Sequence, residues 1–188
     1  MFDKILDNRF IVIYLLPFCI GVFTVFSFQP FNFTYINFIL LPALFALVVF
    51  VSKRTKNVYR KRPYKKNLFL IGLIFGFGFY LSGIYWIAYS LTFDESFKIF
   101  IPFFIILIPL FLGLFYGFST LTFSFLHPKN NLFAILIFVT SLSLFEYFRS
   151  FIFGGFPWNL IAFSFVDYLE FIQLLSVTGT YAFNSIVI

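Results

Sequence analysis

Two ionisable side chains, Glu146 and Arg149, lie within an otherwise apolar stretch of this sequence. A spacing of three residues places them on one face of a helix, where opposite charges can pair. Charged groups in such apolar helices usually face a protein interior or a wet cavity. The pair therefore predicts a site-forming role near the end of its helix. The alternative is that Arg149 extends to a membrane surface while Glu146 neutralises it.

A tight, glycine-rich turn from Gly154 to Asn159 follows the pair within a few positions, and at its centre lies Gly155-Phe156-Pro157-Trp158. Glycine permits backbone angles that other residues avoid, and proline stiffens what comes next. A cationic group and aromatic walls together predict a recess for a phospholipid, with Arg149 near the phosphate and Trp158 against the glycerol or upper acyl chain. The alternative is that Trp158 is a general interfacial anchor.

Few residues in the sequence could support a disulfide framework, nucleophilic catalysis or metal binding. The single cysteine, Cys19, excludes a disulfide framework and lies among apolar residues, whereas a nucleophilic thiolate needs an electropositive, partly exposed site. The single histidine, His127, leaves no histidine cluster for a metal. We therefore predict no catalytic residue, no metal site and no cofactor within these 188 residues.

The composition indicates whether the chain folds in water or in a membrane. Hydrophobic residues make up 62% of the chain, charged residues 11%, and the mean hydropathy is +1.01. Soluble domains average roughly 45–50% apolar and about 25% charged residues. A water-soluble fold of 188 residues could not hide this much apolar surface, so we expect a membrane protein.

Apolar runs long enough to cross a bilayer divide the chain into an all-α, polytopic transmembrane helix bundle. Five full spans are expected, followed by a truncated sixth that begins near Val177, and residues 1–188 form one transmembrane helical domain. Because the last run stops at Ile188, we expect a fragment or an incomplete gene product. Between the last two spans, polar residues every three positions over 160–175 predict an amphipathic helix in the outer interface. The five full spans cover residues 10–28, 33–51, 68–91, 99–126 and 132 onward.

Positive charge is concentrated in one loop. Eight of the 13 Lys and Arg residues lie in residues 53–66, between the second and third spans. Basic loops mark the cytoplasmic side of a membrane, so the N-terminus and the 53–66 loop are expected there, with Asp94 and Trp158 outside. Nucleic acid is the less favoured partner for this charge, because no fold for reading bases accompanies it.

Small residues recur four positions apart in the third and fourth spans, at Gly72 and Gly76 and at Gly113 and Gly117. Such spacing lets helix backbones approach closely in lipid. The simpler alternative is that transmembrane helices contain more glycine in general.

Several motifs together resemble one family. Glu146-Tyr-Phe-Arg149 followed by Gly155-Phe-Pro-Trp158 resembles the E-x-x-R…G-F-P-W signature of bacterial apolipoprotein N-acyltransferases. Phe28-Gln-Pro-Phe31 resembles the family's aromatic-proline motif after the first span. Further similar segments, in the same order along the chain, are Gly76-Phe-Gly-Phe79, Gly83-Ile-Tyr-Trp86-Ile-Ala-Tyr89-Ser90 and Gly179-Thr-Tyr-Ala-Phe-Asn184. The chain departs from the family pattern at Ala88, where an aromatic residue is frequent.

The resemblance implies a function and a location. Members of this family transfer an acyl chain from a phospholipid to the N-terminal lipidated cysteine of a diacylated apolipoprotein, in the bacterial inner membrane. Their catalytic Glu, Lys and Cys belong to a nitrilase-like domain that follows the seventh span. The resemblance therefore implies that this chain supplies scaffold and lipid-binding surface, and that it is inactive alone. The implied lipid-binding residues are Trp86, Tyr89, Glu146, Arg149, Gly155, Phe156, Pro157 and Trp158.

Two other functions remain open on the sequence alone. A small multi-span transporter or channel subunit would have a similar number of helices, although its ionisable groups tend to lie near mid-membrane. A truncated, nonfunctional product is the second alternative.

Overall fold

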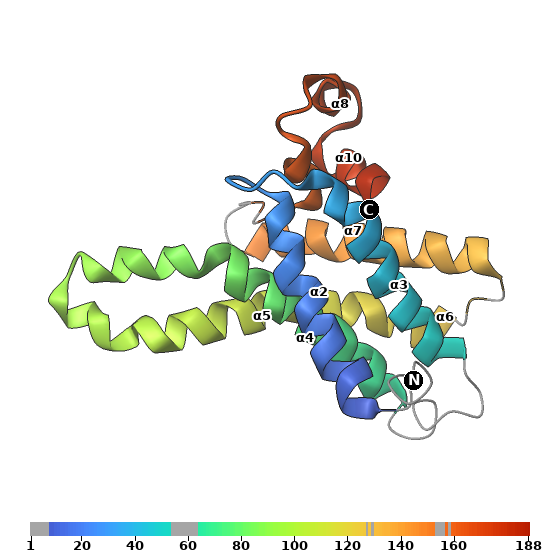
Figure 1. The fold of residues 1–188 in the computed structure, drawn as a ribbon, viewed down its shortest axis with the longest axis horizontal. Helices are drawn as coiled ribbons and strands as arrows, with labels where there is room; N and C mark the ends of the chain where they lie inside the picture. Colours follow the sequence, from blue (N-terminus) through green and yellow to red (C-terminus); the bar gives the residue numbers. More distant parts are fainter. Residues whose placement is uncertain (1–7, 54–63, 127, 129, 153–156, 158) are drawn as a thin grey trace.

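All regular structure in the described parts of the chain is helical. The computed structural model describes residues 8–53, 64–126, 128, 130–152, 157 and 159–188 (Figure 1). Four of its helices are long and apolar enough to cross a membrane, which confirms the expected all-α membrane class. They are Thr34–Ser52, Tyr64–Thr92, Glu95–Leu126 and Asn131–Ile152.

The N-terminal run expected as the first span is a shorter apolar helix, Ile11–Ser27. It divides into a π-helical turn, an α-helix and a 3₁₀ turn. Pro17 lies in the first turn of the α-helix, directly after the π-helical turn. These three elements are η1 (Ile11–Leu15), α2 (Leu16–Thr24) and η2 (Val25–Ser27). A second 3₁₀ turn, η3 (Thr34–Ile36), then leads into α3 (Asn37–Lys53).

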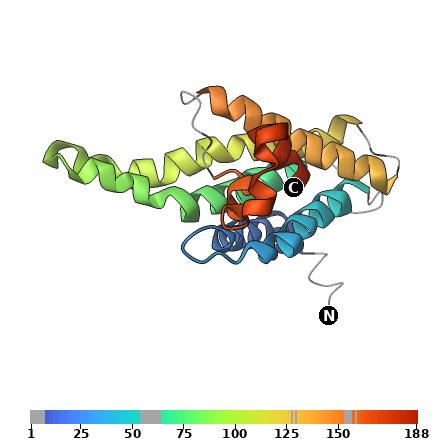
Figure 2. The ribbon, with the colours of Figure 1, turned by 90° about the horizontal axis from the view of Figure 1, so that it is seen from above.

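The runs expected as the third and fourth spans form one long hairpin, α4–α5. Each arm combines an α-helix with a 3₁₀ segment toward the tip, where the Asp94 carboxylate caps the returning arm by accepting a hydrogen bond from the Ser96 N–H at 2.8 Å. Figures 1 and 2 show the hairpin extending well beyond the end of its neighbours. The four elements are α4 (Tyr64–Ile84), η4 (Tyr85–Thr92), η5 (Glu95–Phe100) and α5 (Ile101–Leu121).

Glycine allows the inner halves of α4 and α5 to pack backbone against backbone. A Cβ atom added to Gly76 would lie 2.7 Å from the Gly113 Cα, and one added to Gly72 would lie 2.1 Å from the Tyr116 carbonyl oxygen. Both distances are below van der Waals contact. The glycine spacing in the sequence therefore marks a real helix–helix contact.

The run expected as the fifth span is α7 (Asn131–Ile152), which follows the short helix α6 (Phe123–Leu126) and packs against α5. Aromatic side chains fill the space between the second span and this one: the Phe45 and Phe138 rings meet edge to face with centroids 5.3 Å apart. The core of the bundle thus lies among α2, α3, α4, α5 and α7.

The expectation of one continuous amphipathic helix over 160–175 is wrong. That region contains a 3₁₀ turn and two one-turn helices, followed by α10 at the start of the expected sixth span. The reason is tertiary: the Ser164 carbonyl accepts a hydrogen bond from Thr34 Oγ1 at 2.6 Å, and Ser164 Oγ accepts one from Asn37 Nδ2 at 2.9 Å. Ser164 is therefore buried, away from the exposed polar residues that follow it. The four elements are η6 (Ile161–Phe165), α8 (Leu169–Ile172), α9 (Leu175–Thr178) and α10 (Thr180–Val187).

Candidate functional site

Glu146 is the centre of a buried group of polar side chains. It lies on α7 and is only 2% exposed. Its Oε1 accepts a hydrogen bond from the Tyr116 hydroxyl of α5 at 2.5 Å, and its Oε2 accepts one from Asn184 Nδ2 of α10. Hydrogen bonds to a carboxylate are stronger than neutral ones, and stronger still away from water. Glu146 therefore joins three helices at one point.

Asn184 extends this connection to the segment that follows the Gly155–Trp158 turn. Its side-chain oxygen accepts a hydrogen bond from the Ala162 backbone N–H at 3.0 Å, while its amide nitrogen donates to Glu146. An asparagine can do both because its side chain carries an acceptor and two donors. The residue is fully buried, so α7, η6 and α10 have fixed relative positions here.

Arg149 lies one turn beyond Glu146 and is also buried, with 1% exposed. Its guanidinium carbon lies 5.4 Å from the centroid of the Tyr80 ring, within cation–π range. The Tyr80 ring in turn lies 6.0 Å from the Tyr116 ring, and the charges of Arg149 and Glu146 interact electrostatically. We call Tyr80, Tyr116, Glu146, Arg149 and Asn184 the buried polar cluster.

The burial of Arg149 distinguishes between the two interpretations of the pair. An arginine that extends to the membrane surface exposes its guanidinium to water and head groups. Here the guanidinium packs over Tyr80 instead, so the pair is held inside the protein. Contact between Arg149 and a phosphate stays a prediction.

Most of the predicted aromatic turn lies outside the described residues: this applies to Gly155, Phe156 and Trp158, while Pro157 is half-buried. Asn159, the last residue of the predicted turn, has a positive φ of 44°. A Cβ atom on Gly83 would lie 2.2 Å from the Asn159 side-chain nitrogen, so the end of the turn packs directly on α4.

Trp86 and Tyr89, the other two predicted lipid-binding residues, lie on η4 and are exposed. The Trp86 indole N–H donates to the Gly83 carbonyl at 3.2 Å, which holds the ring against its own helix. Neither residue is part of the buried polar cluster. Ala88, between them, is buried and lines an apolar pocket instead.

Sequence reasoning missed three members of the cluster: Tyr80, Tyr116 and Asn184. Each is a polar residue within an apolar run, and this feature could have marked it as a candidate site residue. Asn184 is also the last residue of the Gly179–Asn184 motif. Their connection to Glu146 and Arg149 depends on how distant segments pack, because Tyr116 and Asn184 lie 30 and 38 residues from Glu146.

The cluster is suited to holding structure and binding rather than to covalent chemistry. A nucleophile needs an adjacent base, and the cysteine of the chain, Cys19, lies half-buried on α2. Within the described ranges, no three His, Cys, Asp or Glu residues come together as a metal site would require.

Comparisons with known proteins find one family. Residues 20–188 match the family model "Apolipoprotein N-acyltransferase N-terminal domain". An apolipoprotein N-acyltransferase of Rickettsia bellii (strain RML369-C) is 45% identical over 121 residues, covering 63% of this chain and 23% of the relative. One from Rickettsia typhi is 39% identical over 153 residues, covering 79% and 29%. One from Brucella melitensis is 31% identical over 177 residues, covering 93% and 32%. The chain thus spans about a quarter to a third of the length of these curated relatives.

Proposed function

The chain belongs to the apolipoprotein N-acyltransferase family, and on that premise we propose that it is the membrane-embedded part of an enzyme that acylates lipoproteins. The acyl donor would be a phospholipid, and the acceptor would be the N-terminal lipidated cysteine of a diacylated apolipoprotein. The family match over residues 20–188 is the observation that carries the proposal, and it removes the support for a transporter or channel.

Within this function, we assign the buried polar cluster a positioning role. It ties α4, α5, α7 and α10 together, and its member Arg149 lies three residues before the end of α7, the helix that precedes the Gly155–Trp158 turn in the sequence. Because Arg149 is buried, we propose that it supports the turn from beneath, while the turn itself contacts the phospholipid head group. Trp158 and Phe156 would then supply the aromatic walls of the head-group site, and the exposed Trp86 and Tyr89 would face lipid beside it.

We also propose a membrane arrangement. Five spans and the start of a sixth would cross the bacterial inner membrane, with the N-terminus and the 53–66 loop in the cytoplasm. Support comes from the basic loop, and from Figure 1, in which the hairpin tip lies at the opposite end of the bundle from the ends of α3 and α4 that flank this loop. Covalent acyl transfer would need residues outside this chain, namely the family's Glu, Lys and Cys.

A chimera tests the proposal. Residues 20–188 replace the matching segment of the Brucella melitensis relative, and N-acylation of a diacylated lipopeptide by phospholipid is followed by mass spectrometry. We expect N-acylated product. Trp158→Ala in the chimera should reduce acyl transfer while expression and membrane insertion stay unchanged. Trp86→Ala, at an exposed position of η4, should reduce acyl transfer as well. A chimera that inserts and is stable yet makes no product contradicts the proposal.

A further inference from the structure

Three cationic side chains gather at the end of the bundle opposite the hairpin tip (Figure 1). Arg9, two residues before η1, donates a hydrogen bond from Nη2 to Asn67 Oδ1 at 2.8 Å, and Lys65 and Lys66 precede Asn67 in the first turn of α4. Successive residues of a helix are about 100° apart around its axis, so Lys66 lies between Lys65 and Asn67. We call Arg9, Lys65 and Lys66 the basic arc.

Two of the three cations are held by contacts within the protein. Asn67 is only 1% exposed, so its amide is a fixed anchor for Arg9. Lys65 Nζ lies 4.6 Å from the centroid of the Phe125 ring of α6, within cation–π range. The bond to Asn67 uses one of the five N–H donors of the guanidinium. Arginine binds phosphate through paired N–H donors, so a guanidinium held in place at this point is suited to a phosphate group.

The acidic side chains that the structure describes lie away from the basic arc. Asp167 accepts a hydrogen bond at 3.1 Å from Gln29, which follows the far end of the N-terminal helix that begins beside Arg9. The first turn of α4 contains no acidic residue, although the amino end of a helix favours negative charge. An anion from outside the chain therefore suits this position. The described acidic residues are Asp94, Glu95, Glu146, Asp167 and Glu170, whereas Asp3 and Asp7 lie outside the described residues.

Apolar side chains beside the basic arc indicate what kind of anion fits. Phe10, which follows Arg9, and Phe125 and Leu126, beside Lys65, are each more than half exposed. A nucleic acid or a free phosphate ion would leave these side chains unused. A phospholipid carries an anionic head group and acyl chains in one molecule, so it can contact the cations and the apolar side chains together.

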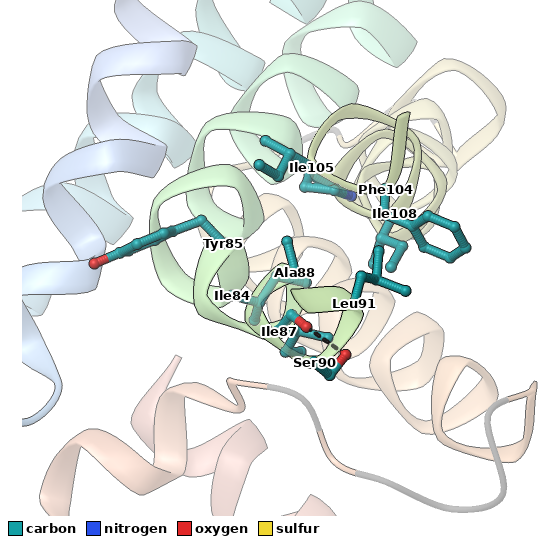
Figure 3. Close-up of a pocket in the computed structure, with 10 residues that line it drawn as sticks. Ile84, Tyr85, Ile87, Ala88, Ser90, Leu91, Phe104, Ile105 and Ile108 are labelled. Atoms are coloured by element: carbon teal, nitrogen blue, oxygen red, sulfur yellow. Dashed lines mark hydrogen bonds between the residues drawn. The ribbon is translucent and has the colours of Figure 1, made fainter. Parts of the chain in front are cut away.

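The opposite end of the bundle does not combine positive charge with apolar surface in this way. Figure 3 shows an apolar pocket between the hairpin arms, and its lining contains no charged side chain. At the hairpin tip, Lys98 pairs with Glu95 at 2.5 Å, and Asp94 adds a further negative charge. An anionic head group is therefore favoured at the basic arc and disfavoured at the tip.

We propose that the basic arc binds the phosphate of an anionic phospholipid, such as phosphatidylglycerol, whose acyl chains lie against Phe10, Phe125 and Leu126. In the membrane arrangement proposed above, this lipid lies in the cytoplasmic leaflet, on the opposite side from acyl transfer. It holds the beginning of the N-terminal helix and the beginning of α4 together and takes no part in the reaction.

Quenching of a single tryptophan by a brominated lipid tests this binding. Phe125→Trp, in a chain that also carries Trp86→Phe and Trp158→Phe, places the reporter beside Lys65 and keeps an aromatic ring there. The 188-residue chain is reconstituted in phosphatidylcholine vesicles that contain brominated phosphatidylglycerol. One basic residue near an anionic lipid surface favours binding about fivefold. We therefore expect phosphatidylglycerol to be enriched at least fivefold over phosphatidylcholine at this reporter.

A second reporter examines the other end of the bundle. With Trp86 as the one remaining tryptophan, exposed on η4, the enrichment should stay below twofold. Both leaflets of the vesicle contain the same lipids, and no acyl transfer is measured. A failure here therefore leaves the proposed topology and enzymatic function unaffected.

The cations are then tested directly. Arg9→Gln, Lys65→Gln and Lys66→Gln together should reduce the enrichment to below twofold. Lys66→Glu alone should reduce it at least threefold. This variant guards against misfolding of the triple variant, because Lys66 is exposed and both anchoring contacts remain in place.

The matched control removes the same amount of charge elsewhere in the 53–66 loop. Arg60→Gln, Lys61→Gln and Arg62→Gln together should keep at least half of the enrichment. Equal losses in the two triple variants would mean that the attraction belongs to the charge of the whole loop, and they overturn the site. Absence of enrichment in the parent chain also overturns it. So does loss of enrichment when inorganic phosphate is added at constant ionic strength, which would mean that the basic arc takes a phosphate ion rather than a lipid.

Discussion

Because the Glu146 carboxylate is buried, we predict that removing its charge destabilises the folded chain. Glu146→Gln keeps the shape of the side chain but removes the charge that compensates Arg149. It also places an amide NH₂ opposite one of the two groups that donate to the carboxylate. If that group is Asn184, its hydrogen bond is lost, and if it is Tyr116, the hydroxyl must turn to accept instead. Breaking a buried ion pair from one side costs about 3–5 kcal/mol.

That cost converts into a measurable shift of the melting temperature. For a chain of about 150–250 residues, 1 kcal/mol corresponds to about 2–4 °C, so Glu146→Gln should lower the Tm by about 6–20 °C. The assay is thermal unfolding of the purified chain in mild detergent. The matched control is Glu170→Gln, the same substitution at an exposed position of α8, which should change stability by less than about 0.5 kcal/mol.

The double variant examines the pairing itself. Arg149→Gln alone should also lower the Tm, but Glu146→Gln combined with Arg149→Gln should lose less than the sum of the two, because the second change removes the uncompensated charge. Strictly additive losses, or a Glu146→Gln effect no larger than that of Glu170→Gln, would refute the pairing.

Three further predictions concern packing, topology and activity. Gly76→Ala should destabilise the chain more than Gly117→Ala, because the new methyl group meets backbone in the first case and the Phe69 ring, which can move, in the second; thermal unfolding of both variants compares them. In a Cys19→Ser background, a cysteine at position 94 should react with an impermeant reagent added outside intact spheroplasts and one at position 60 should not, and the reverse pattern would invert the topology. The purified 188-residue chain should form no N-acylated lipopeptide above a no-protein control, since no activated nucleophile is predicted in it.

The hydropathy of the sequence was sufficient to predict the main helices. The run over 68–91 corresponds to the helix Tyr64–Thr92, and the run from 132 onward to Asn131–Ile152. Such helices form because their backbone groups have no water to bond with in lipid, so each apolar run satisfies its own hydrogen bonds. A local property therefore decided this part of the fold.

Contacts between distant segments could not be predicted in the same way. Glu146 and Arg149 were recognisable as charges in an apolar run, but their partners Tyr116 and Asn184 come from other helices. The polar spacing over 160–175 suggested one helix, and the hydrogen bonds to Ser164 from the 34–37 region produced short turns instead. The hairpin pocket likewise depends on where two arms separate, which neither arm's sequence shows by itself.

The two donors to Glu146 also lie on opposite sides of it in the order of synthesis. Tyr116 precedes Glu146 by 30 residues, whereas Asn184 follows it by 38. At about 5–20 residues per second, the ribosome adds Asn184 about 2–8 seconds after Glu146. During that interval Tyr116 is the one of these two donors that has already been synthesised. The hydrogen bond from Asn184 to Glu146 therefore forms only after α10 has been synthesised, later than the bond from Tyr116.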